Sequence, residues 1–173
     1  MKNNNLNLTM LLSILSVIAI TTSLNSIYAQ ENMTDSKEPK FFAIQHAQSG
    51  SISEINETAY LLELNDVSYK TILFSDMPDR IVTSVSTSNF IGNWSSGEDS
   101  FAVDAPNTVL VVDEQEGEQD VTIVELFNPV YEVDKKVLKY DITPDNTTSI
   151  DFLSEFGQIT LFIDCLHNLP SCF

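Results

Sequence analysis

The chain has 173 residues, of which 25 are acidic and 8 are basic, so its formal net charge at pH 7 is −17. A charge of this sign and size argues against binding to nucleic acid and against adsorption to anionic membranes, and it favours basic partners. Apolar residues make up 43% of the chain and recur in short blocks between polar turns. A packed core can therefore form, and disorder of the whole chain is excluded.

The N-terminus has the layout of a secretory signal peptide. Lys2 precedes an apolar stretch from Leu8 to Leu24, and the small residue Ala29 stands at the expected cleavage site. The stretch is shorter than the roughly 20 apolar residues that span a bilayer, although an uncleaved anchor is the alternative. We expect residues 1–29 to be a signal peptide and residues 30–40 a flexible polar leader. The protein would then be secreted or displayed at the cell surface, without a stable membrane span.

Strand patterns dominate the next part of the chain. Phe41–Gln45 and Ser51–Ile55 are expected to form one strand with a bulge at Gly50. Glu57–Leu64 alternates apolar and polar residues, which is typical of a half-buried strand. A polar turn separates this segment from Lys70–Phe74, and the pair is predicted to form a hairpin.

The second half continues in the same way, and Pro129 is expected to stop one of its strands. Five further β-branched or alternating runs predict strands: Thr108–Val112, Val121–Phe127, Val130–Val133, Val137–Ile142 and Gln158–Asp164. The first two of these runs are expected to form a second hairpin, and the next two a third.

Two segments have helical spacing. Asp79–Trp94 carries apolar residues three to four apart, and Ser149–Phe156 lies between a serine N-cap and Gly157. Many short strands and few helices predict a mostly β fold, a single antiparallel β-sandwich or barrel-like domain with one or two short helices. We expect this domain to span residues 41–164, followed by a C-terminal tail, residues 165–173.

A strand-to-turn corner is the most distinctive local feature. Asp76 ends a predicted strand, Pro78 forces a turn, and Asp79 precedes Arg80, the only arginine of the chain. An arginine beside two carboxylates can form a clamp of charge-assisted hydrogen bonds. The corner is thus a candidate binding site for an anion or substrate. The alternative, favoured here, is a buried ion-paired corner with a structural role.

The corner is one of several short patterns spread from Tyr60 to Asp164. The others are Tyr60–Leu64, Phe90 with Trp94, Asp99–Ala102, Pro106-Asn107, Asn128-Pro129, Tyr140-Asp141, Phe156-Gly157 and Leu161–Asp164. Together they resemble a family of secreted prokaryotic domains that carries an F-S-D-x-P-D-R motif and has no assigned activity. Met77 departs from that pattern, in which a basic residue is usual. The resemblance implies one extracytoplasmic domain and carries over no catalytic residue.

The C-terminal tail contains Cys165, His167 and Cys172. Two cysteines in a secreted chain usually form a disulfide, which is the pairing that we expect. Free thiols, or a copper or zinc site that includes His167, are the alternatives. The acidic segment 113–120 does not fit the spacing of an EF-hand, and we expect it to be a solvated hairpin tip.

No set of residues for catalysis stands out. Nucleophilic hydrolysis needs a base beside the nucleophile, and the chain offers only two histidines, no G-x-S-x-G elbow and no glycine-rich phosphate loop. We therefore expect a secreted binding or interaction module, with no cofactor and no resident metal, whose partner is a cell-surface or basic molecule. The alternatives are an extracytoplasmic hydrolase that uses Asp76, Asp79 and Arg80, and a metal-handling envelope protein that uses Cys165, His167 and Cys172.

Overall fold

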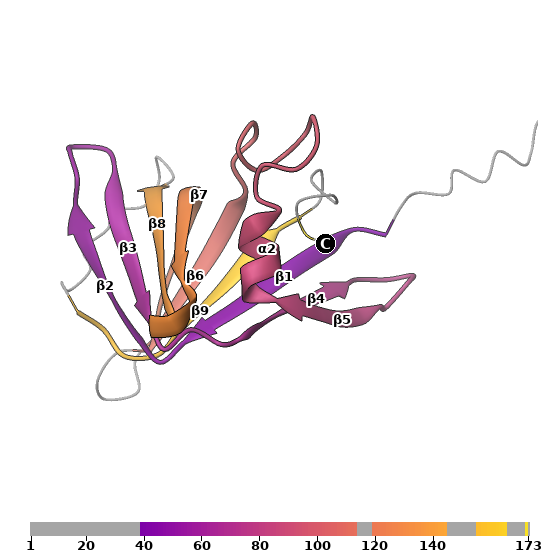
Figure 1. Cartoon of the computed structure of the whole chain (residues 1–173), viewed down its shortest axis with the longest axis horizontal. Helices are drawn as coiled ribbons and strands as arrows, with labels where there is room; N and C mark the ends of the chain where they lie inside the picture. The colour runs from indigo at the N-terminus through magenta and orange to yellow at the C-terminus, as the bar shows by residue number, and fades with distance from the viewer. Residues whose placement is uncertain (1–38, 114–118, 145–154, 166–171, 173) are drawn as a thin grey trace, which may run out of the picture. The chain divides into compact units, whose positions relative to one another are not determined.

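The computed structural model describes residues 39–113, 119–144, 155–165 and 172, so the expected signal peptide and most of the leader lie outside the described residues. The described part is mostly β, as predicted. It contains one antiparallel sheet of nine strands in the order β2-β3-β8-β7-β6-β9-β1-β4-β5, and the sheet is not closed (Figure 1). The strands are β1 (Phe41–Ala47), β2 (Ser49–Glu54), β3 (Tyr60–Asn65), β4 (Lys70–Ser75), β5 (Val82–Ser86), β6 (Asn107–Asp113), β7 (Gln119–Glu132), β8 (Val137–Pro144) and β9 (Ile159–Asp164).

The core lies on one face of this sheet, because side chains alternate between the two faces of each strand. In β1 and β9, for example, Ala43 and Leu161 are fully buried, and their chain neighbours are less buried. The sheet curves strongly around the buried face. Three strands separate β8 from β1, a distance of about 19 Å along a flat sheet. The hydroxyl of Tyr140 on β8 nevertheless donates to Oε1 of Gln45 on β1 at 2.9 Å, which only a curved sheet allows.

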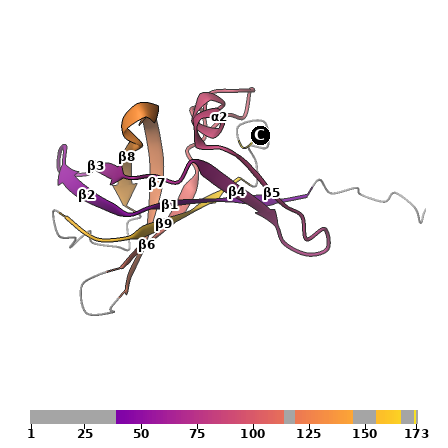
Figure 2. The same ribbon diagram turned by 60° about the horizontal axis from the view of Figure 1, so that its bottom comes forward.

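β1 and β2 are two separate strands joined by a bend at Gln48 (Figure 2). The sequence predicts a single strand here instead, with a bulge at Gly50. β1 pairs with β9 and β4, whereas β2 pairs with β3 at one edge of the sheet. The backbone of Gly50 exchanges hydrogen bonds of 3.2 and 2.9 Å with that of Phe156. A Cβ atom at position 50 would lie 2.6 Å from the Phe156 ring and 2.7 Å from the carbonyl oxygen of Glu63. This close approach explains why glycine is needed here.

Two of the three predicted hairpins are confirmed. β6 pairs with β7, and β7 pairs with β8 after a short 3₁₀ turn, η1 (Val133–Lys135). The predicted hairpin of β3 and β4 is wrong, because β3 pairs with β2 and β8, and β4 pairs with β1 and β5. The loop between β3 and β4 contains the buried Val67. The N–H of Ser68 in this loop donates to the carbonyl of His46 on β1 at 2.8 Å. A period-two pattern specifies which face is buried, but it does not specify the neighbouring strand.

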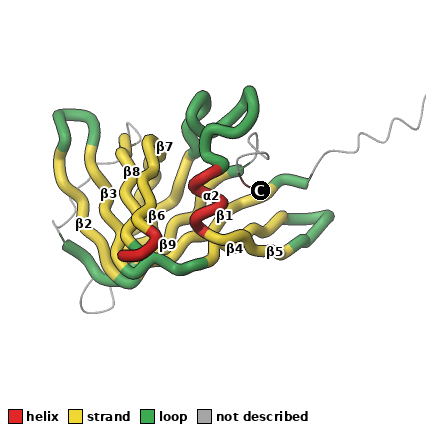
Figure 3. Tube along the Cα trace, viewed as in Figure 1, coloured by secondary structure: helices red, strands yellow, loops and turns green. Residues whose placement is uncertain are grey.

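The predicted helix Asp79–Trp94 is wrong in its first half. Val82–Ser86 is the edge strand β5, rich in β-branched residues and paired with β4. The helix α2 is Thr87–Gly92, and the Ser86 side chain caps it by accepting from the N–H of Asn89 at 3.1 Å (Figure 3). Phe90 is fully buried, so α2 packs onto the inner face of the sheet. Most of the second predicted helix, residues 149–154, lies outside the described residues.

Candidate binding pocket

Four aromatic residues cluster where α2 and the loop after it meet the inner face of the sheet. Trp94 lies at the centre, with its ring centroid 4.8 Å from Phe101, 5.6 Å from Tyr140 and 6.3 Å from Phe90. All four side chains are at most 5% exposed. Tilted and edge contacts of this kind add to the stabilisation from burial. The cluster is therefore firmly packed and can support a surface feature that lies on top of it.

A pocket of about 260 Å³ opens above two members of this cluster. It lies between α2 with its following loop and a short segment of β7. Most of its lining residues are of apolar type, but polar atoms make up more than half of the surface that they expose to the pocket. The lining consists of Ile91, Trp94, Ser95, Phe101, Ala102, Phe127, Asn128 and Pro129. Ligand pockets are usually mostly apolar hollows with a few polar groups, and the surface of this pocket is more polar than that.

The β7 side of the pocket is a bulge. The register between β7 and β8 shifts between Phe127 and Val130, and Asn128 has a left-handed φ of 48°. The side-chain amide of Asn128 donates to Oδ2 of Asp141 on β8 at 2.8 Å, which fixes the bulge. β7 continues beyond Pro129 to Glu132, so the prediction that Pro129 stops the strand is wrong. A bulge accommodates the proline because the paired ladder is already interrupted there.

A buried chain of hydrogen bonds supports the base of the pocket from below. Tyr140 donates to Gln45, the Gln45 amide donates to Oγ1 of Thr71 at 3.2 Å, and this hydroxyl bonds Oγ1 of Thr87 at 3.2 Å. Thr87 donates in turn to the carbonyl of Ser68 at 2.8 Å. The chain joins β8, β1, β4 and α2. Burial raises the pKa of Tyr140 well above the usual tyrosine value, so this hydroxyl stays protonated and remains a donor.

The pocket offers a shaped hollow of mixed polar and apolar surface, and little reactive chemistry. Its lining contains one hydroxyl, on Ser95, one amide, on Asn128, and no ionisable side chain. The described histidine, His46, lies on the outer face of β1, where its Nδ1 is 3.2 Å from Oγ1 of Thr160. The arrangement suits a neutral, apolar or aromatic group that can accept or donate one or two hydrogen bonds at the rim.

The structure places Asp76, Asp79 and Arg80 together in the exposed loop that joins β4 to β5 (Figure 1). None of them lines the pocket. The Asp76 carboxylate accepts from the N–H of Met77 at 2.7 Å, and the Arg80 guanidinium lies 2.8 Å from the Met77 sulfur. Within the described ranges, no ion pair links Arg80 to either aspartate. The expected buried clamp is thus wrong, because a hairpin loop at the sheet edge leaves all three side chains in solvent.

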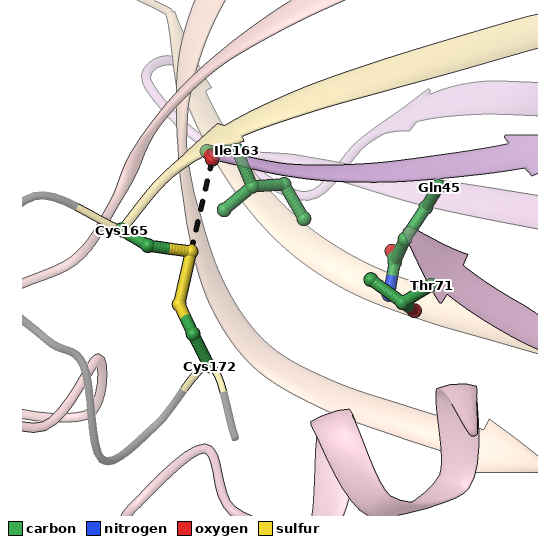
Figure 4. The surroundings of a disulfide bond; sticks show 5 residues. All are labelled: Gln45, Thr71, Ile163, Cys165 and Cys172. Carbon is green, nitrogen blue, oxygen red and sulfur yellow. Dashed lines mark hydrogen bonds between the residues drawn. A yellow bond between two sulfur atoms is a disulfide. The ribbon is translucent and has the colours of Figure 1, made fainter. Parts of the chain in front are cut away.

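Cys165 and Cys172 form a disulfide, the pairing expected from the sequence (Figure 4). Both residues are fully buried, and Sγ of Cys165 lies 3.9 Å from the carbonyl oxygen of Ile163. In this oxidised pair neither sulfur is a thiolate ligand. Across the residues that the structure describes, no three His, Cys, Asp or Glu side chains gather in a way that could hold a metal ion. His167 and most of the acidic segment 113–120 lie outside those residues.

Sequence reasoning missed the pocket, although it had singled out several of its residues. Trp94 ends a predicted helix and Pro129 is predicted to end a strand, whereas Ala102 and Asn128 belong only to the patterns of the family resemblance. The structure brings these separate patterns to one place. A useful signal was present in the Asn-Pro pair within an otherwise regular β-branched strand, since such a pair indicates a bulge.

Comparison with protein-family models, with characterised proteins and with solved structures finds no match. The family resemblance from the sequence patterns therefore stays a prediction. In the described part of the chain, no helix has the length and apolar character needed to cross a bilayer.

Proposed function

We propose that this chain is an extracytoplasmic binding module whose pocket between α2 and the β7 bulge accepts one aromatic or branched apolar group of a partner. The observation that carries the proposal is the pocket itself, a small hollow of mixed polar and apolar surface on a packed aromatic base, with one amide and one hydroxyl side chain in its lining. Binding needs such a surface and no catalytic set.

The size of the pocket supports a small occupant. Pockets for whole drug-sized ligands span about 300–1,000 Å³, and this pocket, at about 260 Å³, falls just below that range. It can hold a single ring or one side chain of a larger partner. The net charge of −17 makes a neutral or basic partner more favourable than an acidic one.

Two features support a place outside the cytoplasm. The N-terminal pattern is that of a signal peptide. A buried disulfide joins Cys165 to Cys172, and such bonds persist mainly in oxidising compartments.

The chain carries its own reporter for a binding test, since Trp94 is its single tryptophan and lines the pocket. We expect N-acetyl-phenylalanine amide to change the Trp94 fluorescence in a saturable way, and N-acetyl-alanine amide to leave it unchanged. Ala102→Phe, which fills the pocket, should abolish the response. Val103→Phe is the matched control, because Val103 is the next residue, is 74% exposed and does not line the pocket. An unsaturable response, or equal loss in both variants, would contradict the proposal.

A further inference from the structure

Two Asn-x-Ser/Thr triplets, the acceptor sequence for N-linked glycans, lie in the described part of the chain. One is Asn56-Glu57-Thr58, in the loop between β2 and β3, and the other is Asn93-Trp94-Ser95, directly after α2. Neither has a proline in its middle position, so the triplet itself does not distinguish them. Their structural surroundings do.

The loop that carries Asn56 is open to solvent. Every residue from 53 to 58 is exposed, and the loop projects beyond the last strand pair of β2 and β3, at the edge of the sheet (Figure 1). Its backbone hydrogen bonds are local, because the N–H groups of Ile55 and Asn56 both donate to the carbonyl of Ala59, at 2.9 and 3.1 Å. An enzyme can therefore reach this loop and change its shape without breaking the pairing of the two strands.

Three donors converge on one end of the Asn56 side chain. Its Oδ1 accepts from the N–H of Thr58 at 3.0 Å, from the hydroxyl of Thr58 at 3.2 Å and from the N–H of Ala59 at 3.1 Å. The three donors identify this atom as the amide oxygen, as in an Asx-turn. The amide nitrogen Nδ2, which is the atom that carries an N-linked glycan, takes no part in these hydrogen bonds and sits on an exposed side chain.

The Asn93 triplet, by contrast, is built into the packed part of the molecule. Asn93 is the C-cap of α2, and its N–H donates to the carbonyl of Asn89 at 3.0 Å. The middle residue, Trp94, is 5% exposed at the centre of the aromatic cluster, and Ser95 lines the pocket. The acceptor sequence includes both the asparagine and the hydroxyl residue two positions later. An enzyme that reached both of them here would have to unpack the cluster.

We propose that Asn56 is an N-glycosylation site of the folded chain and that Asn93 is not. The inference rests on the extracytoplasmic placement proposed above, where an oligosaccharyltransferase uses a polyprenyl-linked oligosaccharide as donor. In the transfer, a bond forms between Nδ2 of Asn56 and the anomeric carbon of the first sugar, and the bond between that carbon and the phosphate oxygen of the donor breaks. One proton leaves the amide nitrogen for the solvent, and the polyprenyl pyrophosphate is the leaving group.

The position of Asn56 gives the glycan a role at the sheet edge. β2 is the outermost strand on its side of the sheet, and an open edge strand presents unpaired backbone groups to other chains. The bridge to Phe156 covers this edge at Gly50. A bulky, hydrated glycan on the adjoining loop shields the other end of the strand, near Glu54. Asn56 does not line the pocket, so the glycan leaves the pocket open.

Glycan transfer to the folded full chain in vitro tests the choice between the two triplets. The reagents are a purified single-subunit oligosaccharyltransferase and its polyprenyl-linked donor. The acceptor chain carries glutamine in place of the asparagines of the triplets outside the described residues, at positions 7, 32 and 146. Mass spectrometry of its proteolytic peptides should find the sugar on Asn56 and none on Asn93.

Variants of the third residue show that the triplet itself is recognised. Thr58→Ala should abolish the transfer and Thr58→Ser should retain it, while Asn93→Gln should leave it unchanged. Residue 58 is exposed, so both of its variants should keep the wild-type circular dichroism spectrum. Transfer to Asn93 of the folded chain, no transfer to Asn56, or equal transfer to the two Thr58 variants would overturn the inference.

A peptide map of the protein from its native source tests whether the site is used. Protein recovered from outside the cytoplasm should carry a sugar on Asn56. A bare Asn56 on such protein would overturn this inference alone and leave the proposed placement and the pocket untouched. Recovery of all the protein from the cytoplasm would overturn the placement, and the glycan with it.

Discussion

The hydrogen bond between Tyr140 and Gln45 is the clearest sign that the open sheet is strongly curved, and the substitution Tyr140→Phe tests it. The substitution removes one oxygen and keeps the ring, which packs 5.6 Å from Trp94. It leaves Oε1 of Gln45, on a side chain that is 1% exposed, without its donor. Removing the hydroxyl while keeping the ring therefore separates the effect of the hydrogen bond from that of the aromatic packing.

The magnitude follows from that geometry. A buried acceptor that loses its partner costs about 1–3 kcal/mol of unfolding free energy. For a domain of this size, each kcal/mol lowers the melting temperature by about 4 °C. We expect Tyr140→Phe to lower the melting temperature by about 4–12 °C. The matched control is Tyr69→Phe, because Tyr69 is 66% exposed, and its change should stay within about 0.5 kcal/mol.

A double-mutant cycle assigns the effect to the pair. Chemical denaturation of Tyr140→Phe, Gln45→Met and the double variant should give a coupling energy of at least about 1 kcal/mol, because the second substitution removes the group that the first leaves unpaired. Zero coupling, or a loss in Tyr140→Phe no larger than in Tyr69→Phe, would refute the contact and with it the tight curvature of the sheet.

Three further outcomes are expected. Burial raises the pKa of Tyr140 above the usual 10.0. The unfolding free energy that the neutral hydroxyl contributes is therefore complete below pH 10 and falls above it, by up to about 1.4 kcal/mol per pH unit. Denaturation at several alkaline pH values should show that the stability of Tyr140→Phe falls less steeply than that of the wild type. Gly50→Ala should lower the unfolding free energy by about 1–3 kcal/mol, because the new Cβ would meet the Phe156 ring and the backbone of Glu63. The control Gly92→Ala should leave the stability unchanged or raise it, because its Cβ would meet nothing within 4 Å. Equal melting temperatures of the two variants would contradict this prediction. Arg80→Ala should change the unfolding free energy by no more than about 0.5 kcal/mol, and so the melting temperature only slightly. A loss of about 3–5 kcal/mol would instead indicate that Arg80 is held in a buried ion pair.

Most strands of the fold could be predicted from the sequence, because alternation and β-branched runs report directly on burial. Val121–Phe127 and Val137–Ile142, for example, lie within β7 and β8. The pairing of β3 with β8 could not be predicted, since these strands are far apart in the chain and period-two patterns are interchangeable between strands. The apolar residues of Val82–Ser86 also fit helical spacing, so the sequence predicts a helix there, and only the pairing with β4 shows that the segment is a strand.

The candidate site was harder to predict than the fold. A pocket depends on which distant segments meet, and no single segment of this chain carries a motif for it. The charged corner at Asp76 and Arg80 drew attention because its residue types suggest chemistry, but a hairpin loop leaves it in solvent. Trp94 and Asn128 become a site only because α2 and the β7 bulge lie side by side on the inner face.

The pocket's role is tested most directly by NMR, because the chain has one indole N–H, on Trp94, and it reports from the pocket itself. We expect addition of N-acetyl-phenylalanine amide to shift the Trp94 indole and Asn128 side-chain signals together along one saturable curve, while the backbone signals of Asp76–Arg80 stay in place. Shifts confined to Asp76–Arg80 would contradict the pocket and favour the charged corner as the binding site. Signals that do not move at all would contradict binding of this class of group.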